Sequence, residues 1–193
     1  MFEIWGTLNG KNKEKDKRLA SYLTRTLTFE EQNSLLFFSP FDKAFEQRLV
    51  TEETAVMTFK HTFFSNSPYV NMKNLKTALN IFLPYKDKII VSLSAECRDY
   101  NLVTEKMIPI TLNIANFKAS IHSSKIFFDE ESGASYFTYM KNSPHLVWLE
   151  DTKSIALKHN LIKSSGYKGI YWENPYPLLD GNWEALTAIY KKA

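Results

Sequence analysis

The chain has 193 residues, of which 44% are hydrophobic and 23% are charged, as is ordinary for one globular domain. Its net charge is +3, and the basic stretch at 11–18 also contains two acids, so we expect a solvated helix start there and no nucleic-acid partner. No run of about 18 apolar residues occurs, so the sequence predicts no transmembrane helix and no membrane partner.

The first quarter of the chain predicts strands that alternate with a helix. Residues 2–5 (FEIW) form a short apolar strand, and residues 13–27 place apolar side chains on one helical stripe. The runs at 34–40 and 54–59 are continuous and apolar, which is typical of strands buried on both faces.

The middle of the chain first continues this pattern and then departs from it. A helix is predicted over 71–83 and a further buried strand over 88–95. From about 101 to 148, short strand-like pieces are separated by turns, which predicts an antiparallel excursion. These pieces are, in order, ITLNI, KIFF, SYFTYM and LVWL.

The alternation of strand and helix returns near the end of the chain. Residues 151–166 predict a helix, with Asp151 or Thr152 as its cap and a glycine at its end. Residues 169–172 form the fifth apolar strand. A last helix is predicted from about residue 180.

Strands and helices at this spacing favour a parallel sheet with right-handed crossovers. Five such strands are compatible with three folds. They could form a doubly wound sheet, a part of a (β/α)8 barrel, or a smaller α/β sheet unrelated to either; a complete barrel needs eight strands. No glycine-rich phosphate-binding motif is present. Cys97 is the single cysteine and the four histidines are scattered, so we expect no disulfide, no metal site and no cofactor.

Several segments together resemble glycoside hydrolase family 18. Residues 54–59 (TAVMTF) resemble its sixth-strand motif, Met-x-Tyr-Asp, and residues 164–175 (SSGYKGIYWENP) resemble its eighth strand. The order and spacing of all the matching segments agree with the family. They are 54–59, 86–102, 127–140 with 145–158, 164–175 and 177–192.

This resemblance implies a specific fold. The five predicted strands would be strands four to eight of a partial (β/α)8 TIM barrel, with a small α+β insertion at 101–150 before the last strand. Residues 1–193 would then form a single truncated barrel domain. Members of the family are mostly secreted, but no signal peptide is visible, so the sequence leaves the compartment open.

The resemblance also assigns a role to the opening residues, MFEIWG. They can be laid on the end of the family's catalytic motif, Asp-x-x-Asp-x-Asp-x-Glu, which puts Glu3 at the general acid and Met1 at the preceding Asp. In the family the substrate's own N-acetyl group attacks the anomeric carbon. The protein must therefore supply a protonated Glu, an Asp that orients the acetamide, and a Tyr hydroxyl.

Several of these requirements are not met in this sequence. Met1 replaces the Asp, Phe59 replaces the sixth-strand Tyr, and Lys60 replaces the Asp that follows it. The seventh-strand Tyr and Gly fall at Glu96 and Cys97. Because loss of one charge-stabilising donor costs about 10²–10³-fold in rate, the departures together imply that most hydrolytic activity is gone.

Other positions keep the family's residue, among them Met57, Arg98 and Trp172. The resemblance implies that Trp172 forms the floor of the subsite that holds the cleaved sugar. From the residues alone, a second interpretation is equally good: Trp172 is a core residue on a buried strand. From the residues alone, Glu96, Arg98 and Asp99 are loop charges at a strand end. The predicted site comprises Glu3 as the catalytic residue, with Met57, Phe59, Glu96, Arg98 and Trp172 as substrate-binding residues.

We therefore predict a chitinase-like protein without catalysis that binds a chitin-type oligosaccharide or a protein partner. One alternative is an active chitinase or N-acetylglucosaminidase with Glu3 as the general acid. The other is a fragment or a half-barrel that self-associates, because unpaired strand edges near 2–5 and 169–172 would invite pairing.

Overall fold

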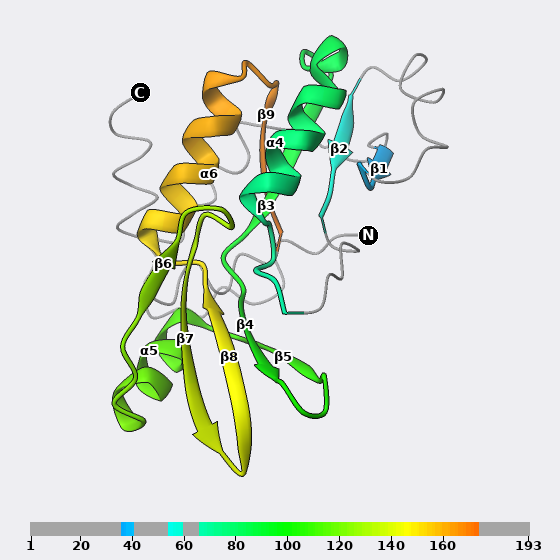
Figure 1. Cartoon of the computed structure of the whole chain (residues 1–193). Helices are drawn as coiled ribbons and strands as arrows, with labels where there is room; N and C mark the ends of the chain where they lie inside the picture. Colours follow the sequence, from blue (N-terminus) through cyan, green and yellow to red (C-terminus); the bar gives the residue numbers. More distant parts are fainter. Residues whose placement is uncertain (1–35, 41–53, 60–65, 174–193) are drawn as a thin grey trace, which may run out of the picture. The chain divides into compact units, whose positions relative to one another are not determined.

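The computed structural model describes residues 36–40, 54–59 and 66–173 (Figure 1). The predicted first strand with Glu3, the first and last predicted helices, and Lys60 lie outside these residues. The described residues have a mixed α/β fold with one parallel and one antiparallel sheet.

Four parallel strands form the first sheet. They are adjacent in the order β1 (Leu36–Phe38), β2 (Ala55–Met57), β3 (Ile89–Ser94) and β9 (Gly169–Glu173). All residues of β2 and β3 are buried, as their continuous apolar runs predict. Among the described strands the order runs without a reversal, whereas a doubly wound sheet reverses at its switch point. The eight-stranded barrel itself stays a prediction.

Helix α4 (Met72–Ile81) follows β2, where the sequence predicts a helix. The side chain of Asn71 caps it by accepting a hydrogen bond from Lys73 N at 2.9 Å. Its buried face carries Leu75 and Leu79. The α-helix is followed by a short 3-10 helix, η2 (Leu83–Tyr85), which contains a proline. Proline cannot continue an α-helix because it has no backbone N–H to donate.

Helix α6 (Thr152–Ser164) precedes β9 and confirms the helix predicted over 151–166. Asp151, and not Thr152, is its cap: the carboxylate accepts a hydrogen bond from Ser154 N at 2.9 Å. Gly166 lies just beyond the helix with φ +75°, the conformation that favours glycine at this position.

The second sheet is antiparallel and has five strands, which confirms the predicted excursion. Its first residue is Cys97, and α5 (Leu112–Ile121) packs on one of its faces (Figure 1). The strands lie in the order β5 (Met107–Ile110), β4 (Cys97–Asn101), β8 (Ser143–Leu149), β7 (Ala134–Lys141) and β6 (Phe127–Asp129).

The structure corrects two predictions in this region. The segment ITLNI is mostly not a strand, because Thr111 accepts a hydrogen bond from Ile114 N at 3.3 Å and starts helix α5. Arg98 and Asp99 are not loop residues; they lie in β4 and are buried. Their burial requires partners for both charges, and these partners define two of the clusters described below.

Candidate functional site

Polar side chains gather beyond the carboxyl ends of strands β2, β3 and β9. Tyr69 lies in the connection from β2 to α4, Arg98 lies in β4 soon after β3, and Glu173 ends β9. In α/β barrels this edge of the sheet carries the ligand site. We name Tyr69, Glu96, Arg98, Tyr100 and Glu173 the rim cluster.

Arg98 lies at the centre of the rim cluster. Its guanidinium carbon is 4.6 Å from the centroid of the Tyr69 ring, a cation–π contact. Its Nε is 3.6 Å from Glu96 Oε1, an ion pair, and its Nη1 donates to the Tyr100 hydroxyl at 3.5 Å. The Arg98 side chain is only 3% exposed, so these contacts take the place of water around the cation.

Tyr69 links Arg98 to the end of β9. Its hydroxyl donates a hydrogen bond to Glu173 Oε2. Burial, followed by the charge of Glu173, raises the pKa of Tyr69, so the hydroxyl stays protonated and remains a donor. The other carboxylate oxygen, Glu173 Oε1, is buried and has no hydrogen-bond partner among the described residues. It is therefore an acceptor that a ligand's donor could satisfy.

A row of aromatic rings leads across the second sheet to the rim cluster. Phe127, Tyr136 and Trp148 are paired in register across β6, β7 and β8, and Trp148 is paired with Arg98 in β4. The ring centroids of Phe127 and Tyr136 lie 5.8 Å apart, and those of Tyr136 and Trp148 lie 5.2 Å apart. The outer end of the row is exposed and its inner end is buried.

The predicted site residues fall into two groups. Glu96 and Arg98 come together as an ion pair in the rim cluster. Met57, Phe59 and Trp172 lie at the carboxyl ends of β2 and β9 with their side chains almost fully buried. A role for these five residues in binding sugar stays a prediction.

Tyr69 and Glu173 were missed by the sequence-based prediction. Neither belongs to a motif that the resemblance supplies at its position. The available signal was their place: Glu173 directly follows a predicted parallel strand, and Tyr69 lies between a predicted strand and the helix after it. Without the fold, nothing distinguishes these two residues from other polar residues near strand ends.

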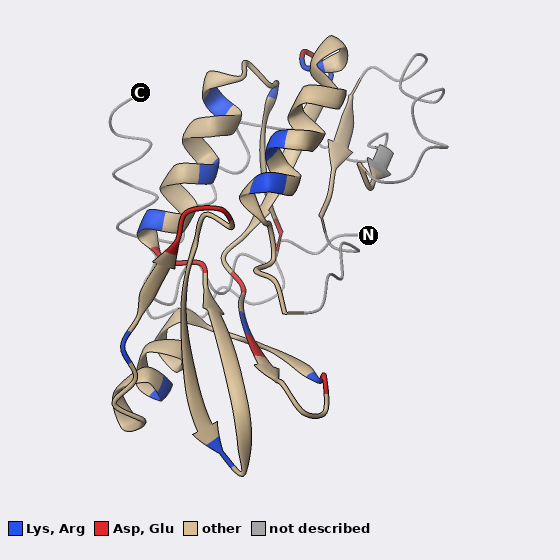
Figure 2. Ribbon diagram, in the orientation of Figure 1, with Lys and Arg blue, Asp and Glu red and all other residues tan. Residues whose placement is uncertain are grey.

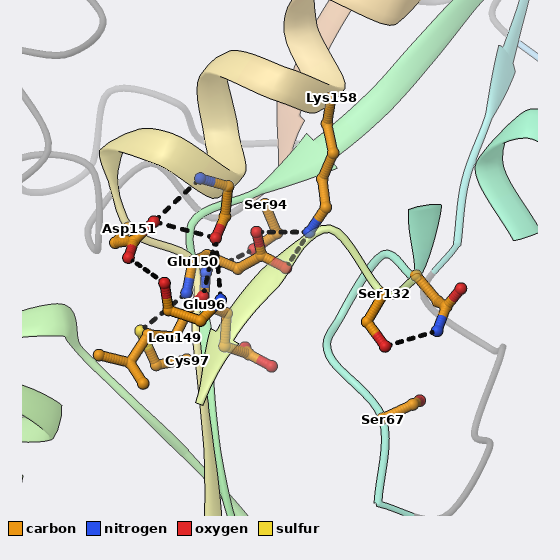
Figure 3. Close-up of polar contacts among 12 residues, drawn as sticks. Ser67, Ser94, Glu96, Cys97, Ser132, Leu149, Glu150, Asp151 and Lys158 are labelled. Atoms are coloured by element: carbon orange, nitrogen blue, oxygen red, sulfur yellow. Dashed lines mark hydrogen bonds and ion pairs between the residues drawn. The ribbon is translucent and has the colours of Figure 1, made fainter. Parts of the chain in front are cut away.

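A buried ion pair lies between the second sheet and α6 (Figure 3). Lys158 Nζ is 2.5 Å from Glu150 Oε1 and 2.6 Å from Glu150 Oε2. Burial raises the pKa of Glu150, against the influence of the lysine. Beside the pair, Glu150 N donates to Cys97 Sγ at 3.4 Å. Burial also raises the pKa of the Cys97 thiol to about 12, so this cysteine is unreactive.

A third cluster, on the face of the second sheet that α5 covers, surrounds Asp99. Lys118 Nζ lies 2.7 Å from Asp99 Oδ2, and the Tyr139 hydroxyl donates to the same oxygen at 2.8 Å. His145 Nδ1 lies 2.8 Å from Asp99 Oδ1. Burial alone would raise the pKa of Asp99, but hydrogen bonds from these three side chains outweigh it and lower the pKa.

None of these clusters forms a metal site. Among the described residues, no group of three histidine, cysteine, aspartate or glutamate side chains is placed to hold a metal ion. Nor is any helix in this part of the chain long and apolar enough to cross a bilayer. The rim cluster, at the sheet edge where barrels bind ligands, is therefore the strongest candidate for a functional site.

No family model matches the chain. Over 58 residues the chain is 40% identical to the cortical fragment-lytic enzyme of Bacillus subtilis (strain 168). This stretch is 28% of the chain and 14% of that enzyme, so the likeness covers a small part of either protein.

Solved structures match a much larger share of the chain. The spore cortex-lytic enzyme SleL from Bacillus cereus matches with a TM-score of 0.65 and 21% identity, over 79% of this chain and 40% of that one. A mutant of the class V chitinase from Nicotiana tobaccum, in complex with NAG4, matches with a TM-score of 0.61 and 14% identity. That match covers 90% of this chain and 62% of the chitinase.

At these identities the likeness concerns the fold. The chain spans about half the length of the solved structures that it matches. The matches include chitinases and an N-acetylglucosaminidase of glycoside hydrolase family 18, so the predicted resemblance is confirmed for the fold. Over most of its length, the chain is similar in structure to the chitinase-like proteins of glycoside hydrolase family 18.

Proposed function

We propose that this chain binds a glycan of N-acetylated amino sugars at the rim cluster and hydrolyses it weakly or not at all. The observation that carries the proposal is the meeting of Tyr69, Arg98 and Glu173, which come from the β2–α4 connection, from β4 and from the end of β9. The choice of glycan is supported by the fold relatives, one of which is a chitinase mutant in complex with NAG4. In this proposal β1, β2, β3 and β9 are strands five to eight of a partial barrel.

The rim cluster offers the contacts that such a sugar needs. Glu173 Oε1 can accept a hydrogen bond from an acetamide N–H or from a hydroxyl group. Arg98 fixes the Tyr69 ring through the cation–π contact, so the hydroxyl donor is held in place before a ligand arrives. Phe127, which is exposed, and Tyr136, which is partly exposed, provide flat apolar surfaces for the faces of further sugar rings.

Weak hydrolysis is supported by the residue at the end of β2. Phe59 stands where the family has a tyrosine, and its side chain is buried. Phenylalanine has no hydroxyl to hold the acetamide oxygen while charge develops during the reaction. Loss of one such donor costs about 10²–10³-fold in rate.

Calorimetric titration with NAG4 tests the binding proposal. We expect saturable binding, weakened about two- to tenfold in Tyr69→Phe because one hydrogen bond at the site is lost. Tyr85→Phe is the matched control, since Tyr85 lies in η2 outside the rim cluster, and its affinity should equal that of the unmodified protein. No heat from NAG4 or from a peptidoglycan-type tetrasaccharide would rule out a glycan site.

The alternative is an active hydrolase with Glu3 as the general acid. The stretch that is 40% identical to a lytic enzyme favours it. A fluorogenic chitobioside assay separates the two proposals, with Glu3→Gln as the paired variant. Turnover that disappears in Glu3→Gln would replace the binding-only proposal, whereas background rates in both proteins support it.

A further inference from the structure

Exposed apolar side chains concentrate in one part of the molecule. Twelve large hydrophobic side chains are exposed among the described residues, and nine of them lie between residues 102 and 140. The most exposed are Val103 at 67%, Phe117 at 65% and Met140 at 68%. A concentration of this kind marks an interaction surface more often than scattered apolar residues do.

Helix α5 carries the centre of this surface. Ile114, Phe117 and Ile121 are spaced by three and four residues, so they lie on one face of the helix, and all three are exposed. The opposite face, with Leu112 and Ala115, packs on the second sheet. A helix that is apolar on both faces is normally covered on both. We name Ile114, Phe117 and Ile121 the α5 patch.

Two hairpin ends add further apolar side chains. Val103 lies in the connection from β4 to β5, and Met140 lies near the end of β7. The two hairpins are neighbours, because Leu102 N donates to Pro144 O at 2.9 Å. Apolar side chains at protruding turns cannot pack against their own sheet, so they are available to a partner.

The charges around the α5 patch are almost all positive. From residue 102 to 128 the chain has three lysines and a single acid, Glu105. Lys118 is paired with Asp99, so Lys106 and Lys125 are the lysines of this stretch that a partner could contact. Figure 2 shows the lysines on α5 and on the hairpin ends. The next three acids along the chain have other partners: Asp129 accepts a hydrogen bond from Ser132 N, Glu130 pairs with Lys153, and Glu131 pairs with Lys73.

We propose that the α5 patch docks on an anionic lipid surface, with α5 lying in the plane of the interface. Aliphatic side chains and a phenylalanine beside lysines suit this partner, because the apolar groups enter the acyl boundary and the lysines meet the headgroups. The strongest anchors of protein interfaces are tryptophan, tyrosine and arginine, and the α5 patch contains none of them.

This contact is peripheral and independent of the glycan site. The sequence led us to expect no membrane partner because it lacks a spanning segment, but docking on a surface requires none. A helix of 10 residues is about 15 Å long, which suits a helix that lies in the interface and does not cross it.

Vesicle co-sedimentation tests the proposal. We expect the protein to bind vesicles with about one-third phosphatidylglycerol and to bind pure phosphatidylcholine vesicles much less, with high salt reducing the difference. The double variant Phe117→Ser/Ile121→Ser should lower the partition coefficient about tenfold or more, because two apolar side chains no longer enter the interface. Lys125→Gln should lower it about fivefold.

Matched controls and a second measurement complete the test. Leu157→Ser removes an exposed apolar side chain on α6, 39% exposed, and should leave vesicle binding unchanged. Failure to bind the anionic vesicles, or equal loss in Leu157→Ser, would overturn the proposal. So would a concentration-dependent dimer in sedimentation velocity that the double variant abolishes, since the patch would then join two copies of the chain. The vesicles contain no glycan, so none of these results bears on the sugar site.

Discussion

Lys158 and Glu150 form an ion pair at 2.5 Å in which neither side chain is more than 2% exposed. The pair joins the end of β8 to the middle of α6, so it holds the second sheet against a helix that precedes the parallel strand β9. Water cannot solvate either charge once its partner is removed. The stability of this junction therefore depends on both residues together.

Removal of one partner should be far more costly than removal of both. We expect Lys158→Met to lower the free energy of unfolding by about 3–5 kcal/mol, because it leaves Glu150 buried without a cation. The double variant Glu150→Leu/Lys158→Met should recover most of this loss. Urea denaturation measures both effects, and additive losses in the double variant would contradict the prediction.

The same variant should also depend on pH. Burial raises the pKa of Glu150, and without the lysine only the smaller influence of the Arg98 charge opposes this effect. A carboxyl group whose folded pKa is raised contributes stability below its unfolded pKa, and that contribution is lost as pH rises. The deficit of Lys158→Met should therefore be larger at pH 8 than at pH 5, and a deficit that is the same at both pH values would argue against a buried charge.

Asp99 should control stability at acid pH. Its folded pKa is lowered, chiefly because Lys118, His145 and Tyr139 outweigh burial, so its contribution is present above the unfolded pKa and is lost as pH falls through the folded pKa. We expect Asp99→Asn to cost about 1.5–3 kcal/mol at pH 7 and to flatten the decline below about pH 4. Urea midpoints from pH 7 to pH 3 test this, with the exposed Asp87→Asn as the control.

Gly133 should tolerate no side chain. Its φ is +64°, and a Cβ built there would lie 2.9 Å from Met72 Cβ. We expect Gly133→Ala to cost about 2–4 kcal/mol through strain and the clash. Gly169→Ala is the control, because the nearest atom to its added Cβ, in Ile90, is 3.9 Å away. In a thermal melt, a midpoint for Gly133→Ala equal to that of Gly169→Ala would contradict the prediction.

Arg98 should not be replaceable by lysine. A lysine keeps the charge but has no planar fork to lie over Tyr69 while also reaching Tyr100. We expect Arg98→Lys to cost about 1–2 kcal/mol in unfolding free energy and to weaken NAG4 binding. An affinity equal to that of the unmodified protein, in a variant that remains folded, would separate the rim cluster from glycan binding.

Much of the fold could be predicted from the sequence because the parallel strands are continuous apolar runs. The runs at 34–40, 54–59 and 88–95 are apolar on both faces of a strand. They are therefore stable mainly as strands of a sheet that is buried on both faces. Helix α5 could not be predicted in this way. Its outer face is as apolar as its inner one, so no helical stripe appears, and only the cap at Thr111 marks its start.

The candidate site could be predicted only in part. The family resemblance pointed to Glu96 and Arg98 because they fall on the Tyr and Arg positions of the seventh-strand motif. Tyr69 and Glu173 are 104 positions apart in the chain, and only the parallel sheet brings the ends of β2 and β9 to one edge. A contact that depends on the pairing of distant strands has no local signal in the sequence.

The hydrogen bond from Tyr69 to Glu173 closes a loop of the chain that includes the whole second sheet. Arg98 reaches the same tyrosine from inside that loop. A ligand donor that drew Glu173 away from Tyr69 would therefore alter the contact between Tyr69 and Arg98. Because Arg98 lies in β4, the position of that strand would be affected as well. Ligand binding at the rim cluster and the packing of the second sheet are in that case thermodynamically linked. Ligand binding would change the free energy of packing by the same amount as a change in packing changes the free energy of binding.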